Sequence, residues 1–338
     1  MKKLFLMLAA AAAVASCSKD YTIVADQGEA IEFGNVFVDN ATRATDPSYS
    51  TSGKGVALTQ FNVYGAVGGV NIFNGNTVTK GTADYGEVWT MEASAPKQYW
   101  ITGADYEFVA VVDGNKKVGE NVITKTTVNG AGIPTTITYN SDGATDLLCA
   151  REVRNDNTDT SVVAFEFTHL LSKVNFTVTN DDKDAVDYSF VVKKINFAGN
   201  VAGVYNVTDG VWYNNQFTTG NTVLGNERTV DSTTVKDIVV ASGAASNELG
   251  TEVLFLPGEY EITFTVDILY KGNIITTTNY PTTGTYEFTL AKNNAYNFNV
   301  TVAVGELIQF TATTMPEWDN GNTDDTDNDT TNDSVVLQ

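Results

Sequence analysis

Alternation of apolar and polar residues with a period of two is the feature that most limits how this chain can fold. In residues 106–112 (YEFVAVV), Tyr106, Phe108 and Ala110 fall on one face, and residues 296–304 (YNFNVTVAV) alternate in the same way. Residues two apart share one face of a β-strand, whereas an amphipathic helix repeats every three to four residues. Turn-rich stretches separate these segments and no long helical pattern occurs, so the sequence predicts an all-β fold of the sandwich type.

Shorter patterns predict individual strands and turns. Residues 30–38 (AIEFGNVFV) are expected to form one strand near the N-terminus. Asn74-Gly75 and Asp209-Gly210 are dipeptides that supply the positive φ angles of tight hairpins, so we expect a turn at each. Residues 169–173 (HLLSK) are expected to form a compact link between two sandwiches.

The first 16 residues have the anatomy of a secretory signal. Lys2 and Lys3 precede an apolar run over residues 4–14, which is too short for an ordinary membrane-spanning helix. The run ends in Val-Ala-Ser-Cys, the pattern of a bacterial lipobox, in which Cys17 is acylated and becomes the new N-terminus. The alternative is a plain cleavable signal with an incidental cysteine. Acylation would tether the precursor to a membrane without embedding it.

Composition narrows the class of partner. The 338 residues are enough for two domains of ordinary size, and the formal net charge of −21 argues against nucleic acid and anionic lipid as partners. With Cys17 consumed by lipid, Cys149 remains as the only other cysteine, so no intrachain disulfide is expected. Its setting in Asp-Leu-Leu-Cys-Ala predicts a small buried apolar residue.

Residues that could carry catalysis or bind a metal are sparse. His169 is the only histidine and its apolar neighbours predict a buried structural role; no Gly-x-Ser-x-Gly motif occurs, and a zinc site is implausible. The acidic tail imitates the start of a calcium loop but has Thr330 and Val336 where Gly and Glu are required. We therefore expect no catalytic residue, metal or cofactor. Chance pairs among 41 acidic residues leave a glycoside hydrolase as a distant alternative.

The four tryptophans admit two interpretations. They could form a sugar-stacking platform, or they could be core and sheet-edge residues, which is the commoner case. They are Trp89, Trp100, Trp212 and Trp318.

Several motifs, taken in order, resemble the fimbrillin family, the type V pilins of Bacteroidales. They begin with the lipobox at Cys17 and Thr-Arg-Ala at residues 42–44, and the resemblance extends over nearly the whole chain. The later motifs are YEFVA at 106–110, DLLCA at 146–150, FEFTHLLSKV at 165–174, LPGEY at 256–260 and YNFNVTV at 296–302.

The resemblance implies two tandem transthyretin-like β-sandwich domains and a defined maturation. Such proteins reach the outer membrane as lipoproteins, and an arginine-specific extracellular protease removes the N-terminal segment, here between Arg43 and Ala44. A C-terminal strand of one subunit then fills the vacated groove of the next. The expected segments are a signal peptide (1–16), a lipidated propeptide with an excisable strand (17–43), two sandwiches (44–170 and 171–305) and a C-terminal extension (306–338).

The sequence thus predicts a fimbrial shaft subunit that supports adhesion, works by assembly and ends up extracellular in fimbriae. Its expected partners are other copies of itself, other pilus subunits, the protease and, for the precursor, the outer membrane. Residues 307–314 and residues 334–338 (SVVLQ) are both candidates for the donated strand. The alternative is a monomeric surface lipoprotein that binds glycans or host ligands through the loops of the sandwiches.

Overall fold

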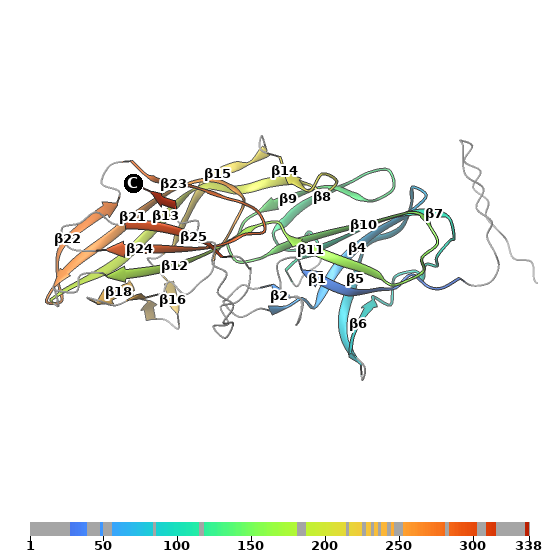
Figure 1. Cartoon of the computed structure of the whole chain (residues 1–338), viewed down its shortest axis with the longest axis horizontal. Helices are drawn as coiled ribbons and strands as arrows, with labels where there is room; N and C mark the ends of the chain where they lie inside the picture. The colour runs from blue at the N-terminus through green and yellow to red at the C-terminus, as the bar shows by residue number, and fades with distance from the viewer. Residues whose placement is uncertain are drawn as a thin grey trace, which may run out of the picture.

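The computed structural model confirms an all-β fold. It describes residues 28–38, 48–49, 56–83, 86–114, 118–180, 187–213, 216–224, 228–230, 233–235, 238–241, 245–246, 253–280, 284–302, 309–315 and 335–337. These residues form strands and turns and contain no α-helix. None of them therefore belongs to a helix long and apolar enough to cross a membrane. The molecule is elongated, and its N-terminal and C-terminal strands lie toward opposite ends of the long axis (Figure 1).

A seven-stranded sheet occupies the N-terminal half. Its order is β1-β11-β10-β7-β4-β5-β6, antiparallel except for the β1–β11 pair. The strands are β1 (Phe33–Val38), β4 (Gln60–Val67), β5 (Val70–Ala83), β6 (Gly86–Met91), β7 (Ala104–Asp113), β10 (Leu147–Asn157) and β11 (Val163–His169). Although β1 and β6 are the two ends of this order, they lie in contact, so the sheet curls back on itself.

The apolar residues of β7 explain why this strand is central. Tyr106, Phe108 and Ala110 point into one apolar cluster, whereas Val109 and Val111 point into another on the opposite face. A strand buried on both faces needs apolar residues at nearly every position, which is how residues 106–112 read. The predicted strand is confirmed.

A nine-stranded sheet is built around the 19-residue strand β13 (Tyr188–Asn206). One edge of β13 pairs with β21 and then β9, and the register places β18, β15 and β14 along the other edge. The remaining strands are β8 (Ile123–Val128), β9 (Pro134–Asn140), β14 (Val211–Trp212), β15 (Thr218–Leu224), β18 (Ile238–Ala241), β21 (Gly258–Tyr270), β22 (Asn273–Tyr280) and β23 (Tyr286–Leu290).

A six-stranded sheet faces it across a core that contains Phe197, Phe264 and Phe298. Here β12 pairs in parallel with β24, and β25 and β26 extend the sheet beyond β24. The strands are β12 (Ser172–Asn180), β19 (Ala245–Ser246), β20 (Val253–Phe255), β24 (Ala295–Val302), β25 (Gln309–Met315) and β26 (Val335–Leu337). Two small pairs complete the described strands: β2 (Ser48–Tyr49) with β3 (Val56–Ala57), and β16 (Arg228–Val230) with β17 (Thr233–Val235).

The apolar cluster that contains Val109 joins the two halves of the molecule. It brings Val109 and Cys149 together with Ile137 of β9 and Tyr205 of β13. The β8–β9 hairpin lies within residues 44–170, yet it pairs with β13 from residues 171–305, so strands of both expected domains share one sheet. The division into two domains stays a prediction.

Of the two predicted hairpin turns, one was wrong and one is confirmed. No turn occurs at Asn74-Gly75, because β5 continues through it. Gly75, with φ of 72°, is instead the extra residue of a bulge opposite Val63 and Tyr64. The β4–β5 turn lies at residues 68–69. The hairpin at Asp209-Gly210 is confirmed by the β13–β14 pairing.

The expected link at residues 169–173 was also wrong in its extent. His169 ends β11 and Ser172 begins β12, which leaves two residues between the strands. Both of them, Leu170 and Leu171, are fully buried, and the Leu170 carbonyl accepts a hydrogen bond from Trp212 Nε1 at 2.8 Å. The connection is therefore part of the core.

Candidate functional site

The candidate site is the groove that holds β1 and the residues just before it. β1 pairs with β11 on one side, with Phe33 opposite Val163 and Gly34 opposite Ala164, and it lies against β6 on the other side. The Val163 amide donates to the Glu32 carbonyl at 2.8 Å. Residues 28–31 continue along residues 98–100: the Ile31 amide donates to the Gln98 carbonyl at 2.9 Å, and the Trp100 amide donates to the Glu29 carbonyl at 3.0 Å.

Three apolar side chains anchor this segment in the groove. Ile31, Phe33 and Val36 are buried, whereas Glu29 and Glu32 are exposed. The Phe33 ring stacks on Phe165 and makes edge contacts with Phe73 and Phe108, with ring centroids 5.5–5.9 Å apart. Burying a side chain of this size contributes about 1.5–3 kcal/mol. Phe33 is therefore the main anchor.

The groove is also narrow at two glycines. A Cβ added to Gly34 would lie 2.9 Å from Val162 Cγ1, and one added to Gly28 would lie 3.0 Å from the Trp100 carbonyl oxygen. Larger residues at these positions would require the walls to shift. The alternation within residues 30–38 predicted the strand, but only the structure shows that its register is interrupted between Gly34 and Phe37.

Both candidates for a donated strand pair with their own chain. β25 runs antiparallel to β24, with Thr301 opposite Gln309, and β26 pairs with β25, with Phe310 opposite Leu337. The predicted strands at residues 307–314 and 334–338 are thus present with slightly different bounds. β24, β25 and β26 lie in the left half of Figure 1, and β1 lies in the right half.

The predicted processing residues lie outside the described residues. These are the signal peptide (1–16), the lipidation site Cys17 and the cleavage site between Arg43 and Ala44; Trp318 and most of the acidic tail also lie outside. The nearest described residue of β1 to the cleavage site is Val38, five positions before Arg43.

The single histidine has a structural setting, as predicted. His169 Nδ1 lies 2.6 Å from Asp146 Oδ2, and both side chains are at most 1% exposed. The other carboxylate oxygen of Asp146 accepts the Leu147 amide at 2.8 Å. No substrate could reach the imidazole without unfolding the surrounding strands.

The other candidate side chains are equally enclosed. Burial raises the pKa of the Cys149 thiol to about 12, which keeps it protonated and confirms its apolar role. Trp89, Trp100 and Trp212 are at most 8% exposed, so these three are core residues and do not form a sugar-stacking platform.

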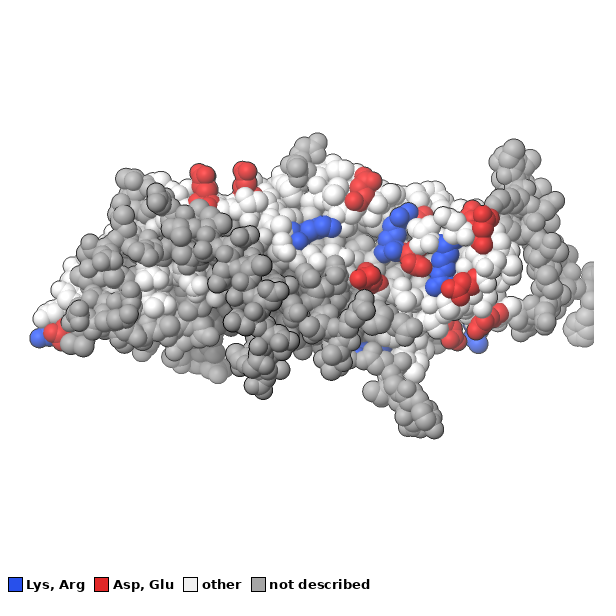
Figure 2. Space-filling model, in the orientation of Figure 1, with Lys and Arg blue, Asp and Glu red and all other residues white. Residues whose placement is uncertain are grey.

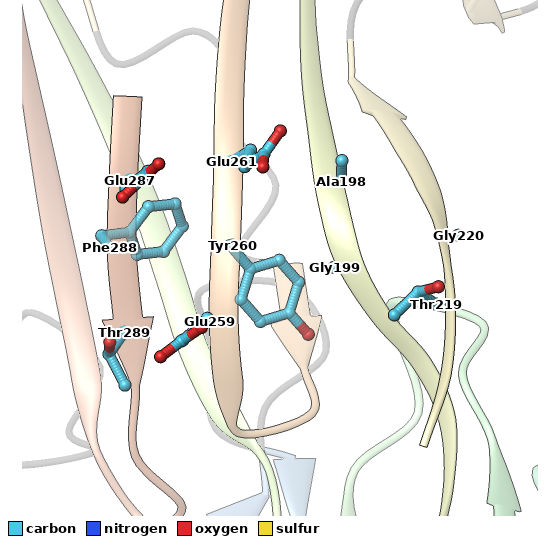
Figure 3. A pocket seen from close by; sticks show the side chains of 10 residues that line it. All are labelled: Ala198, Gly199, Thr219, Gly220, Glu259, Tyr260, Glu261, Glu287, Phe288 and Thr289. Carbon is cyan, nitrogen blue, oxygen red and sulfur yellow. The ribbon is translucent and has the colours of Figure 1, made fainter. Parts of the chain in front are cut away.

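A second depression lies on the nine-stranded sheet and is shown in Figure 3. Glu259 and Glu261 of β21 and Glu287 of β23 are exposed along it, and Glu261 stands directly opposite Glu287. Tyr260 extends across its floor toward Gly199, with its hydroxyl 2.8 Å from the Asn200 and Leu256 carbonyl oxygens. Among the described residues, no group of three or more histidine, cysteine or acidic residues could hold a metal ion. Besides the carboxylates, Thr219 and Thr289 line the depression.

Charged side chains do not mark a site on the visible face. Figure 2 shows acidic and basic side chains of the described residues in small separate patches. Two ion pairs between described residues are Arg151 with Glu107 at 2.9 Å and Arg154 with Glu152 at 3.3 Å.

Comparison with known proteins identifies the class of protein. Residues 42–318 match the fimbrillin-like family, so the chain belongs to that family. Fimbrillins are structural proteins of fimbriae, which places the chain at the cell surface and among structural proteins rather than enzymes. The search of curated proteins found no match.

Solved structures share the fold at low sequence identity. A fimbrial protein from Bacteroides vulgatus has a TM-score of 0.58 and 16% identity, over 86% of this chain and 99% of its own. A candidate cell adhesion protein from Bacteroides ovatus has a TM-score of 0.50 and 13% identity, over 89% of this chain and 99% of its own. At such identities the likeness establishes the fold alone.

Proposed function

We propose that this chain is the precursor of a fimbrial shaft subunit that polymerises by strand exchange. The precursor is exported through the signal peptide at 1–16, is lipidated at Cys17 and is held at the outer membrane. An arginine-specific extracellular protease cuts between Arg43 and Ala44, and the mature subunit joins other copies and other pilus subunits in fimbriae that support adhesion. It carries two transthyretin-like sandwiches, at 44–170 and 171–305, and an extension at 306–338.

The observation that supports this proposal most is the position of β1. Among the described strands it pairs with β11 alone, and it lies upstream of Arg43. Cutting at Arg43 would leave it attached by hydrogen bonds and by the contacts of Ile31, Phe33 and Val36 alone. These are contacts that another strand of suitable sequence could replace.

The physical consequence of losing β1 favours assembly. Its departure would leave the backbone groups of β11 unpaired and expose the rings around Phe33, and an incoming strand would restore both. Because the candidate donor strands and the groove lie in different halves of the molecule, a contact between two copies joins unlike surfaces, and a series of such contacts forms an open filament where the rotation between copies does not close a ring. The product would be a filament.

Limited trypsin digestion of the purified, unlipidated precursor tests this proposal. We expect a cut before Ala44, detected by N-terminal sequencing, followed by SDS-resistant multimers. Arg43→Ala should abolish both results, and Cys17→Ala in the native cell should release the precursor from the membrane. A clean cut at Arg43 that leaves a stable monomer would favour the monomeric surface-binding alternative.

A further inference from the structure

The chain repeats the sequence of its N-terminal anchor segment near its C-terminus. Residues 28–33 read Gly-Glu-Ala-Ile-Glu-Phe, and residues 305–310 read Gly-Glu-Leu-Ile-Gln-Phe. Four of the six positions are identical, and the other two replace Ala30 with Leu307 and Glu32 with Gln309. The first segment fills the groove described above, and the second begins just after the core strand β24.

The identical positions are those at which side-chain identity matters in the groove. Gly28 has no room for a larger residue against the Trp100 carbonyl. Glu29 Oε2 accepts a hydrogen bond from the Thr160 hydroxyl at 2.6 Å. Ile31 and Phe33 are the buried anchors. A second segment with Gly, Glu, Ile and Phe at the same spacing could make every one of these contacts.

The two differing positions place little demand on the side chain. Glu32 is exposed, and it contributes its carbonyl oxygen to the Val163 amide, which glutamine would supply equally. Ala30 forms an isolated backbone bridge with Tyr99 and is itself partly exposed, so a leucine could extend toward the surface. The pattern of identity and difference thus follows the contacts of the groove.

We propose that residues 305–310 of one copy replace residues 28–33 in the next copy, in the same direction and register. This inference rests on the proposed function and resolves which segment is donated. Phe310 then enters the pocket of Phe73, Phe108 and Phe165, and the donated strand runs parallel to β11. The competing segment, residues 334–338, has no aromatic residue to fill that pocket.

In this register the donated strand makes one close contact that β1 does not make. Thr311 would take the position of Gly34, where an added Cβ lies only 2.9 Å from Val162 Cγ1. The donated strand therefore has to displace the Val162 side chain, which β1 does not. Val162→Ala should consequently favour the donated strand over β1 and increase the amount of multimer formed after cleavage, whereas Val109→Ala, in the core away from the groove, should not.

Peptide binding to the full-length, unlipidated Phe33→Ala variant tests the segment. Weakening the anchor should let a peptide with residues 305–315 displace β1 and raise the melting temperature, and a peptide with residues 28–38 should do the same. Phe310→Ala in the first peptide should weaken binding by about 100-fold or more, because it removes the buried ring. Gln309→Ala, the matched control, should leave binding nearly unchanged.

The outcomes separate this inference from the proposed function. If the 28–38 peptide binds and the 305–315 peptide does not, or if a 334–338 peptide binds instead, the assignment of the donated segment is wrong while exchange at the groove stands. If the 28–38 peptide also fails to bind, exchange at this groove is wrong, and the proposed function fails with it.

Disulfide trapping tests the register with Phe33 intact. In trypsin-cut precursor carrying Cys17→Ala, Thr311→Cys and Ala164→Cys should cross-link two copies, because Gly34 pairs with Ala164. Thr311→Cys with Glu166→Cys is the control displaced by two residues and should not. The native thiol at Cys149 is buried and should stay unreactive. Preferential cross-linking of the displaced pair, or of Val336→Cys with Ala164→Cys, would overturn the register.

Discussion

The ring of Phe33 stacks on the ring of Phe165, with centroids 5.8 Å apart and an angle of 7° between the ring planes. Phe33 lies upstream of the proposed cleavage site, and Phe165 lies in β11, the strand that pairs with β1. The contact therefore joins the segment that we propose is displaced to the sheet that stays in place. The proposed strand exchange requires this contact to break.

Phe33→Ala should destabilise the intact precursor by about 3–5 kcal/mol, the usual cost of deleting a buried phenylalanine. Chemical denaturation monitored by tryptophan fluorescence would measure it, because Trp89 and Trp100 belong to the same cluster. Glu32→Ala, one residue away on the exposed side, is the matched control and should change stability by less than about 0.5 kcal/mol. Equal small effects from both substitutions would show that β1 is not an anchored part of the core.

Gly34→Ala should destabilise the precursor by about 1–3 kcal/mol, because the added methyl group meets Val162 Cγ1. The cost should be smaller in a Val162→Ala background, where that contact is absent. A double-mutant cycle from denaturation midpoints measures the difference. Additive effects would indicate that the two residues do not approach each other as the structure has them.

Local alternation predicted many of the strands, but it missed β8 and β15 and could not predict how the strands pair. Residues 106–112 and 296–304 contain their own period, so β7 and most of β24 follow from sequence. The parallel pairing of β1 with β11 and the pairing of β9 with β13 connect residues far apart in the chain, and no local pattern encodes them. Gly75 shows the same limit, because one dipeptide suits either a hairpin or a bulge.

The candidate site could be predicted in part. Residues 30–38 were recognisable as a strand, and Phe33 as one of its apolar residues. That Phe33 would be the anchor depends on Phe73, Phe108 and Phe165 converging from three other strands. The likeness of residues 28–33 to residues 305–310 is visible in the sequence, but its meaning depends on knowing which side chains of the first segment touch the groove.

Asp146→Ala should destabilise the protein by about 1–3 kcal/mol, because it removes the carboxylate that the buried His169 imidazole contacts. His169→Phe added to this variant should recover part of the loss, since it removes the buried imidazole that has lost its carboxylate contact. Thermal or chemical denaturation of the single and double variants measures both effects. A double variant that is less stable than Asp146→Ala alone would contradict this account of the pair.

Cys149 should resist alkylation in the folded protein, because its thiol is buried and its raised pKa of about 12 keeps it neutral. The labelling rate in a Cys17→Ala background should rise only under conditions that unfold the core. Rapid labelling at pH 8 without loss of structure would contradict the predicted burial.

The raised pKa of the Cys149 thiol also predicts in which direction the stability of the folded protein changes at alkaline pH. The folded state keeps the proton that the unfolded chain releases above the ordinary pKa of 9.0. This contribution to stability is therefore present below pH 9 and is lost as the pH rises toward 12. Cys149→Ala should lose less stability over that interval than the parent chain, as measured by denaturation at a series of pH values. An identical pH dependence in the two proteins would rule out a contribution from this thiol.

The most direct test of strand exchange is the fate of the fragment with residues 18–43 after cleavage at Arg43. Trypsin-treated, unlipidated precursor would be separated into monomers and multimers by size, and the fragment measured in each by mass spectrometry under denaturing conditions. The account predicts that cleaved monomers retain the fragment and that multimers lack it, because another copy has taken its place. Multimers that contain one fragment for each chain would contradict exchange at this groove.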